Sequence, residues 1–176
     1  AYYELIRDYQ EAPEEDEPVE FKAIRPSDKE YSPLPKHLSP STMEGEMAEV
    51  EPVDVISERI PCTGTSDYAA FGTCIHEKYG PGVAHKEHPF MYMNGLGQVV
   101  GGSIDLLWET AEGVVVVDYK NYPGYDDVTS PDSDFYAGKY GPQLAAYREA
   151  AGKMPGVKVL DTLVFYPVQG RLVRLK

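Results

Sequence analysis

Apolar residues recur at helical spacing in two parts of the chain. In the first part, intervals of three, four and four residues place one apolar stripe on an α-helix, formed by Tyr68, Phe71, Ile75 and Tyr79. Thr65 or Ser66 can cap the start of this helix, and Gly80-Pro81-Gly82 ends it. Residues 141–152 predict a second helix, which ends at Gly152.

Alternating or continuous apolar runs predict five β-strands, at residues 88–94, 98–109, 113–120, 157–168 and 170–176. Asn94-Gly95 is a hairpin signal between the first two strands. The third strand contains four consecutive valines, which predicts burial on both faces in the middle of a sheet. The order helix, three strands, helix, two strands predicts an α/β fold. Residues 121–137, rich in Asp, Pro and Tyr, are expected to form a mobile loop.

Residues 1–60 differ in composition from the rest of the chain. An acidic run with two prolines occupies residues 11–20, and residues 31–41 contain three prolines and three serines. Such segments bury little apolar surface and usually stay extended. We therefore expect residues 1–60 to be an acidic, Pro-rich extension or linker, partly packed on a core domain at 61–176. Residues 49–60, with some β-branched character, are the part expected to lie on the core.

The formal net charge of −13 is concentrated in that extension. Residues 1–60 hold 16 Asp and Glu against 6 Lys and Arg, whereas residues 61–176 hold 13 against 10. An acidic chain binds DNA poorly on its own, because the phosphate backbone repels it. The charge is compatible with a protein that receives its DNA strand from a larger assembly.

Several classes of protein are excluded or disfavoured by what the sequence lacks. No apolar run reaches the roughly 18 residues of a membrane-spanning helix, and residues 1–10 do not resemble a signal peptide. Cys62 and Cys74 form no CxxC pair, which excludes a four-thiolate zinc or iron–sulfur site. Two reduced thiols in a cytoplasmic protein are favoured over a disulfide between them. The chain has no GxxxxGK[ST] phosphate loop, so it is not itself an ATPase.

Two carboxylates and one ammonium stand at the ends of neighbouring predicted strands. Asp118 and Lys120 are two residues apart in the valine strand, so their side chains point to the same side of the sheet. Asp105, in the preceding strand, joins them if the hairpin register places it opposite. Carboxylates bind hard cations such as Mg²⁺ or Mn²⁺, which activate water for phosphodiester hydrolysis. The alternative is a simple Asp–Lys ion pair at the end of a strand.

Four segments resemble, in order, the motifs of RecB-like nucleases of the PD-(D/E)XK superfamily: GTCIHE (72–77), GGSIDLL (101–107), VVVVDYK (114–120) and GPQLAAY (141–147). KEHPF (86–90) is similar to the strand that usually precedes the second motif. KHLSPS (36–41) looks like the segment that joins the two domains of UvrD-, AddA- and RecB-type helicase–nucleases. The resemblance covers roughly 36–176. It implies a restriction-endonuclease-like core, with a central mixed β-sheet of about five strands flanked by helices.

The resemblance also implies a role for individual residues. His76, Asp105, Asp118 and the backbone carbonyl of Tyr119 would bind the metal, Mg²⁺ or Mn²⁺. Lys120 would be the catalytic lysine.

Two residues on the second helix would support that lysine. Gln143 and Tyr147 would lie beside the site and hold Lys120 or the DNA backbone, completing the catalytic set with Asp105, Asp118 and Lys120. The connection from His76 to Glu87 is shorter than the helical insertion usual in the family.

Three functions remain open at this point. The favoured one is a metal-dependent DNA nuclease, acting as an exonuclease on single strands fed by a helicase motor in double-strand-break repair or recombination. The second is a catalytically inactive nuclease-fold module that binds DNA or protein within a helicase complex. The third is a restriction-type or stand-alone repair nuclease. Four tyrosines after the active strand either stack on unpaired bases or pack within their loop: Tyr122, Tyr125, Tyr136 and Tyr140.

Overall fold

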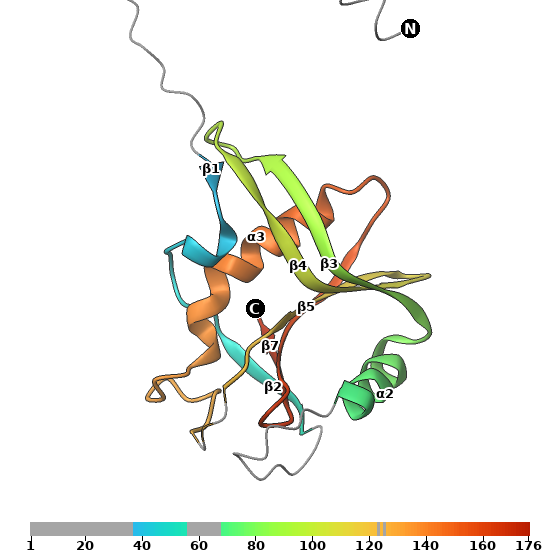
Figure 1. Ribbon diagram of the computed structural model, residues 1–176, viewed down its shortest axis with the longest axis vertical. Helices are drawn as coiled ribbons and strands as arrows, with labels where there is room; N and C mark the ends of the chain where they lie inside the picture. The colour runs from blue at the N-terminus through green and yellow to red at the C-terminus, as the bar shows by residue number, and fades with distance from the viewer. Residues whose placement is uncertain (1–36, 56–67, 123, 125) are drawn as a thin grey trace, which may run out of the picture. The chain divides into compact units, whose positions relative to one another are not determined.

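The computed structural model describes residues 37–55, 68–122, 124 and 126–176, which all belong to the unit Leu34–Lys176 (Figure 1). Its strands are β1 His37–Leu38, β2 Val50–Val55, β3 Gly82–Met93, β4 Val99–Thr110, β5 Gly113–Tyr119, β6 Val159–Tyr166 and β7 Arg171–Leu175. Its α-helices are α2 Tyr68–Tyr79 and α3 Gly141–Gly152, and its short 3₁₀ helices are η1 Pro40–Thr42 and η2 Ala137–Tyr140.

The strands form one mixed sheet in the order β1-β4-β5-β6-β7-β2, with β3 paired to β4. Only β1–β4 and β5–β6 are parallel among these pairs. A parallel pair needs a crossover connection, because both strands run in the same direction. Helix α3 supplies that crossover between β5 and β6, and this places it against the sheet beside the end of β5 (Figure 1).

The two helices cover opposite faces of the sheet, and the valine strand separates them. Val115 and Val117 pack with Phe71 and Ile75 of α2. Val114 and Val116 pack on the other face, in the cluster that contains Tyr147 and Ala151 of α3. All four valines are buried, which confirms the expectation of a central strand with two covered faces.

The β3–β4 hairpin is long and regular up to its turn. Asn94 closes that turn through its side-chain oxygen, which accepts hydrogen bonds from the backbone amides of Leu96 and Gln98 at 3.0 and 2.9 Å. Gly97 follows with a φ of 73°, a left-handed conformation that glycine adopts without steric cost. The turn therefore forms where Asn94-Gly95 predicts it.

The α/β fold and the order of its elements are confirmed, with additions. Helix α3 has the predicted bounds, and all five predicted strands are present. Strand β3 begins at Gly82 rather than His88, because the chain turns directly from α2 into the sheet. Two further strands, β1 and β2, come from residues 37–55, and β2 pairs with β7 along the far edge of the sheet.

Most of the segment predicted as a loop, residues 121–137, contains no helix or strand where it is described, and η2 begins at its last residue. Its aromatic side chains pack within the protein. Tyr122 stacks on Phe135 with ring centroids 3.3 Å apart, and the Tyr136 hydroxyl donates a hydrogen bond to the carbonyl of Ala48. Tyr125 lies outside the described residues. These contacts favour packing over base stacking for Tyr122 and Tyr136.

Two further expectations concern the cysteines and the absence of a membrane-spanning helix. Cys74 is a buried free thiol, and Cys62 lies outside the described residues. None of the helices that the structure describes has the length and apolar character of a membrane span.

Candidate active site

The register of the β4–β5 hairpin places the two candidate carboxylates across from each other. Leu106–Val117 is the last pair of the ladder, and the same register continued by one step sets Asp105 opposite Asp118, whose pKa the charge of Asp105 raises. The Asp105 carboxylate replaces the next ladder hydrogen bond, because its Oδ2 accepts from the backbone amide of Tyr119 at 2.8 Å. This bond fixes the orientation of the Asp105 side chain at the end of β5.

Asp118 and Lys120 lie on the face of the sheet that α3 covers, as strand alternation predicts. Lys120 Nζ is 2.8 Å from Asp118 Oδ2. Asp118 is 1% exposed, whereas the Lys120 side chain is 21% exposed. The pair therefore presents an ammonium group at the solvent boundary with a buried carboxylate behind it.

Gln143 connects these residues to α3. Its side-chain oxygen accepts a hydrogen bond from Lys120 Nζ at 3.0 Å. Its side-chain nitrogen donates to Asp118 Oδ1 at 3.3 Å and to the Tyr147 hydroxyl at 2.8 Å. Gln143 and Tyr147 are four residues apart, so they lie on adjacent turns of one helix face. Both are buried, so the amide has one orientation that satisfies all three contacts.

Burial dominates the electrostatics of Asp118. It raises the pKa of that carboxyl to about 6, and the negative charge of Asp105 adds to the effect, while the ammonium of Lys120 opposes it. Asp118 Oδ2 is buried, and its charged neighbour is the Lys120 ammonium at 2.8 Å. The site thus holds a buried carboxylate that faces one ammonium and feels the negative charge of a second carboxylate.

The donor set fits a hard divalent cation. Asp105 and Asp118 offer carboxylate oxygens, and the Tyr119 carbonyl directly follows Asp118 in the chain. Oxygen ligands of this kind suit Mg²⁺ and Mn²⁺, and a cation between the two carboxylates would offset the repulsion that raises the pKa of Asp118. Within the described ranges, no three His, Cys, Asp or Glu side chains are close enough to hold an ion together.

His76 is not brought into this group by the structure. It is exposed on α2, and α2 packs on the face of the sheet opposite to Asp118 and Lys120. The Tyr119 ring points to the α2 face and packs edge-on against Phe71, with ring centroids 5.9 Å apart. Metal binding by His76 therefore stays a prediction from the resemblance alone.

Two residues near the site were not identified as members of it from the sequence. The Tyr140 ring lies under Lys120, with Nζ 4.4 Å from the ring centroid. This is a cation–π distance, so the Tyr140 ring forms part of the wall of the site. No sequence pattern marks this tyrosine, because η2 alone decides where its ring points.

Glu87 is the second of these residues. Lys86 pairs with Leu106 and His88 pairs with Ile104, which leaves Glu87 across from Asp105. Its φ of 49° is the one positive φ among the described non-glycine residues. Ser103 Oγ donates to its carboxylate at 3.3 Å. Burial raises the pKa of Tyr147, and the charge of Glu87 is among those that add to this effect. In the sequence, only the KEHPF segment, residues 86–90, pointed to the neighbourhood of Glu87.

Residues 37–175 match the family model described as the PD-(D/E)XK nuclease superfamily. The match includes the first two strands, the hairpin, both helices and every candidate residue discussed above. No curated protein matches the chain.

Proposed function

Because the chain belongs to the PD-(D/E)XK nuclease superfamily, we propose that this site hydrolyses phosphodiester bonds of DNA with Mg²⁺ or Mn²⁺. The observation that carries the proposal is the pairing of two carboxylates at one end of the sheet: Asp118 is buried, Lys120 Nζ lies 2.8 Å from its Oδ2, and the charge of Asp105 raises its pKa. A solitary structural ion pair would not need a second carboxylate across the hairpin.

Asp105, Asp118 and the Tyr119 carbonyl would hold the cation. When bound, a divalent cation polarises phosphate oxygens and lowers the pKa of bound water. Asp105 is kept in place for this task by the Tyr119 amide, and Asp118 by the Gln143 amide. The carboxylates thus arrive with their orientation already set by hydrogen bonds on their other sides.

Lys120 acts on the water or on the phosphate. An ammonium group has three N–H donors. One is used by Gln143 Oε1, and Nζ also rests against Asp118 and the Tyr140 ring. Because the side chain is partly exposed, a remaining donor is available to a substrate oxygen. There it orients the attacking water or stabilises charge that develops on phosphorus oxygens.

We propose further that the chain is RecB-like, with its DNA supplied by a helicase motor in the same chain or complex. In that setting it would act as a cytoplasmic exonuclease on single strands during repair or recombination. Two features support this: the resemblance of residues 36–41 to the segment in helicase–nucleases, and the net charge of −13. Such a charge weakens unaided capture of DNA, so delivery of the strand by a partner would compensate for it.

The test is cleavage of end-labelled single-stranded DNA by the full chain with Mn²⁺ or Mg²⁺. We expect Lys120→Ala to lower the rate about 100- to 1,000-fold, because one preorganised donor at the reacting phosphate is lost. Lys139→Ala is the matched control, since Lys139 also lies over the Tyr140 ring, at 5.1 Å, without touching Asp118. Equal rates for wild type and Lys120→Ala would refute the proposal, as would no cleavage even with a helicase motor present.

The second candidate is an inactive nuclease-fold module. The exposed position of His76 on the opposite face favours it, as does the acidic charge. The intact contacts among Asp118, Lys120 and Gln143 oppose it. Calorimetric titration separates the two, because the nuclease binds Mg²⁺ or Mn²⁺ and loses this binding in Asp118→Asn. Absence of binding at millimolar concentrations would support the module.

A further inference from the structure

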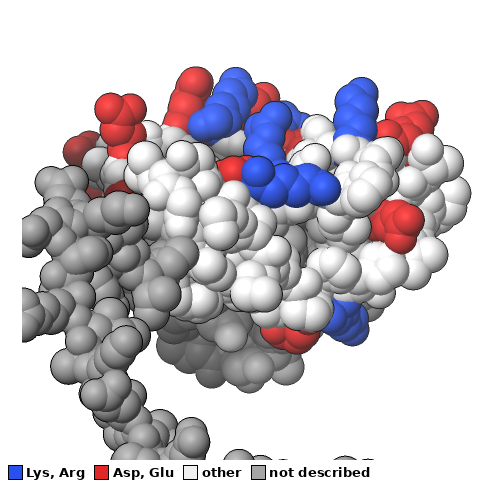
Figure 2. Space-filling view, turned by 90° about the horizontal axis from the view of Figure 1, so that it is seen from above, with Lys and Arg blue, Asp and Glu red and all other residues white. Residues whose placement is uncertain are grey.

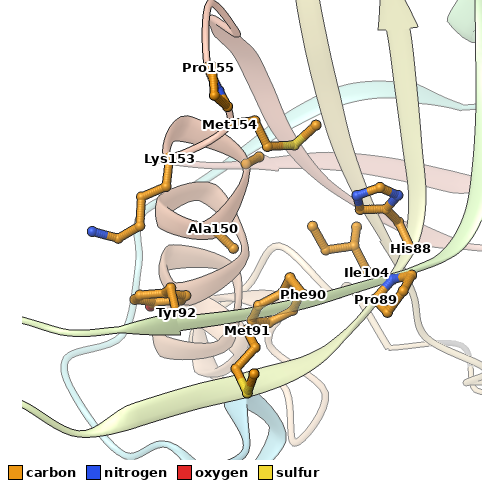
Figure 3. Close-up of a pocket in the computed structure, with 11 residues that line it drawn as sticks. His88, Pro89, Phe90, Met91, Tyr92, Ile104, Ala150, Lys153, Met154 and Pro155 are labelled. Atoms are coloured by element: carbon orange, nitrogen blue, oxygen red, sulfur yellow. The ribbon is translucent and has the colours of Figure 1, made fainter.

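A pocket of about 350 Å³ lies between β3 and α3 (Figure 3). Its volume is within the range of pockets that hold small ligands, roughly 300–1,000 Å³. Phe90 and Tyr92 line it from the strand side, and Ala150, Lys153 and Met154 line it from the last turn of α3 and the residues after it, as Figure 3 shows. Ile104 of β4 completes the apolar surface.

This pocket adjoins the candidate active site. The Phe90 ring packs edge-on against Tyr147, with ring centroids 5.6 Å apart and an interplanar angle of 79°. The Tyr147 hydroxyl accepts a hydrogen bond from Gln143, the residue that holds Lys120. On the sheet, Ile104 immediately precedes Asp105. Both sites therefore lie on the α3 face and share the Phe90–Tyr147 contact as a wall.

The lining is aromatic, with a cation at its rim. The rings of Phe90 and Tyr92 lie 6.2 Å apart at 29°, and both side chains are half-buried. The Tyr92 hydroxyl is already engaged, since it donates to Glu149 at 3.0 Å. Lys153 Nζ lies 5.2 Å from the centre of the Tyr92 ring and pairs with Glu149 at 3.2 Å.

Such a lining suits a flat, apolar-faced group attached to an anion. A nucleobase has these faces, and Lys153 would contact its phosphate by exchanging its exposed, weak ion pair with Glu149 for one with the phosphate. Aromatic side chains accept any base, because every base has a π-face. With the Tyr92 hydroxyl bound to Glu149, the pocket discriminates poorly among base edges.

We propose that this pocket holds one unpaired base of a single-stranded DNA substrate whose neighbouring phosphate lies at Lys120. The inference rests on the proposed nuclease function on single strands and adds a place for one base. A paired base could enter only by leaving its stack, which costs a few kcal/mol, so single strands are preferred. Because the pocket accepts any base, binding of the DNA strand depends little on its base sequence.

The experiment measures binding of the full chain in EDTA, where cleavage does not interfere. Fluorescence anisotropy compares a labelled oligothymidylate with a strand of equal length whose backbone lacks bases. We expect wild type to bind the oligothymidylate about 5- to 150-fold more tightly, the range of one stacked base. Ala150→Leu fills the pocket from a buried helix position with a residue that also favours helix, and should abolish this difference.

Ala145→Leu is the matched control, because Ala145 is an exposed position on the same helix. It should leave the base-dependent difference intact. Tyr92→Leu provides a second variant that removes a ring without filling the pocket, and it should reduce the difference. Circular dichroism verifies that each variant is folded.

Equal affinity of wild type for both strands would overturn the proposal, as would failure to bind the oligothymidylate at all. Base-dependent binding that survives in both Ala150→Leu and Tyr92→Leu would also overturn it, and would assign the pocket to another occupant, such as an apolar peptide segment. Failure of the nuclease proposal looks different: base-dependent binding would persist while the chain with Mn²⁺ cuts no strand.

Discussion

One side-chain amide, that of Gln143, decides the geometry of the site at the scale of single residues. It accepts from Lys120 and donates to Asp118 and Tyr147. Without it, Lys120 would keep its ion pair but lose the contact that directs its other donors outward. We therefore treat Gln143 as a positioning residue rather than a group that touches the scissile phosphate.

Gln143→Leu tests this role. We expect kcat for single-stranded DNA to fall about 10- to 100-fold, as is common when a residue that orients a catalytic group is lost, while KM changes little. Steady-state cleavage assays measure both. Gln98→Leu, in the β3–β4 turn, is the control and should leave both constants unchanged. A rise in KM with unchanged kcat would contradict a positioning role.

Glu87 illustrates strain in a single residue next to the site. Its φ of 49° is a left-handed conformation that costs an L-residue about 1–2 kcal/mol, whereas glycine in a strand costs about 0.5–1 kcal/mol relative to alanine. We expect Glu87→Gly to raise the free energy of unfolding by about 0.5–1 kcal/mol, measured by urea denaturation. Lys86→Gly, at the neighbouring position in β3, should lower the free energy of unfolding instead. Equal destabilisation by both would show that Glu87 is not strained.

At the scale of elements, the carboxylate of Asp161 joins α2 to two strands. Asp161 of β6 accepts from Arg174 of β7 at 2.9 and 2.8 Å and from the hydroxyl of Tyr79, the last residue of α2, at 2.6 Å. Burial opposes ionisation of Asp161, but the hydrogen bonds from Arg174 and Tyr79 outweigh it, so the pKa of Asp161 is lowered.

The pH dependence of stability follows from this shift. Because the folded-state pKa of Asp161 lies below its ordinary value of about 3.9, the ionised carboxylate stabilises the fold at neutral pH. This contribution is lost as the pH falls through the folded-state pKa. We expect Asp161→Asn to lower the free energy of unfolding by about 1–2 kcal/mol near neutral pH and by less in strong acid. Urea unfolding at several pH values measures this, and a loss that is independent of pH would contradict it.

At the scale of the whole chain, the net charge of −13 is expected to weaken DNA binding. On the face shown in Figure 2, Lys and Arg side chains gather toward one edge with Asp and Glu among them, and the described part of that face is not uniformly basic. The acidic run at 11–20 adds further negative charge. Repulsion between such charges and phosphates acts over about 10 Å at 0.1 M salt.

Neutralising the acidic run should therefore strengthen DNA binding. We expect the chain with Glu14→Gln, Glu15→Gln, Asp16→Asn and Glu17→Gln to bind oligothymidylate several-fold more tightly than wild type at low salt. The difference should shrink as salt is added, because screening removes the repulsion. Anisotropy titrations at several salt concentrations measure this. An unchanged affinity at low salt would show that the run does not face the DNA.

The sequence by itself determined the features that depend on local pattern. Period-two and helical spacing placed α3 and the five core strands, and the valine run fixed β5 between two covered faces. Alternation along β5 put Asp118 and Lys120 on one side. These follow from the backbone repeat and from the burial of apolar surface, and they do not require knowledge of any distant contact.

Only the tertiary structure decided which residues from different elements meet. It decided the strand partners of β1 and β2, although residues 49–60 were expected to lie on the core, because β7 and β4 offered unpaired edges. It placed Glu87 across from Asp105 and Tyr140 beneath Lys120, and it left His76 on the other face. The reason is that register and the side of packing are set by many weak contacts together, whereas the motif pattern records only residue type and spacing.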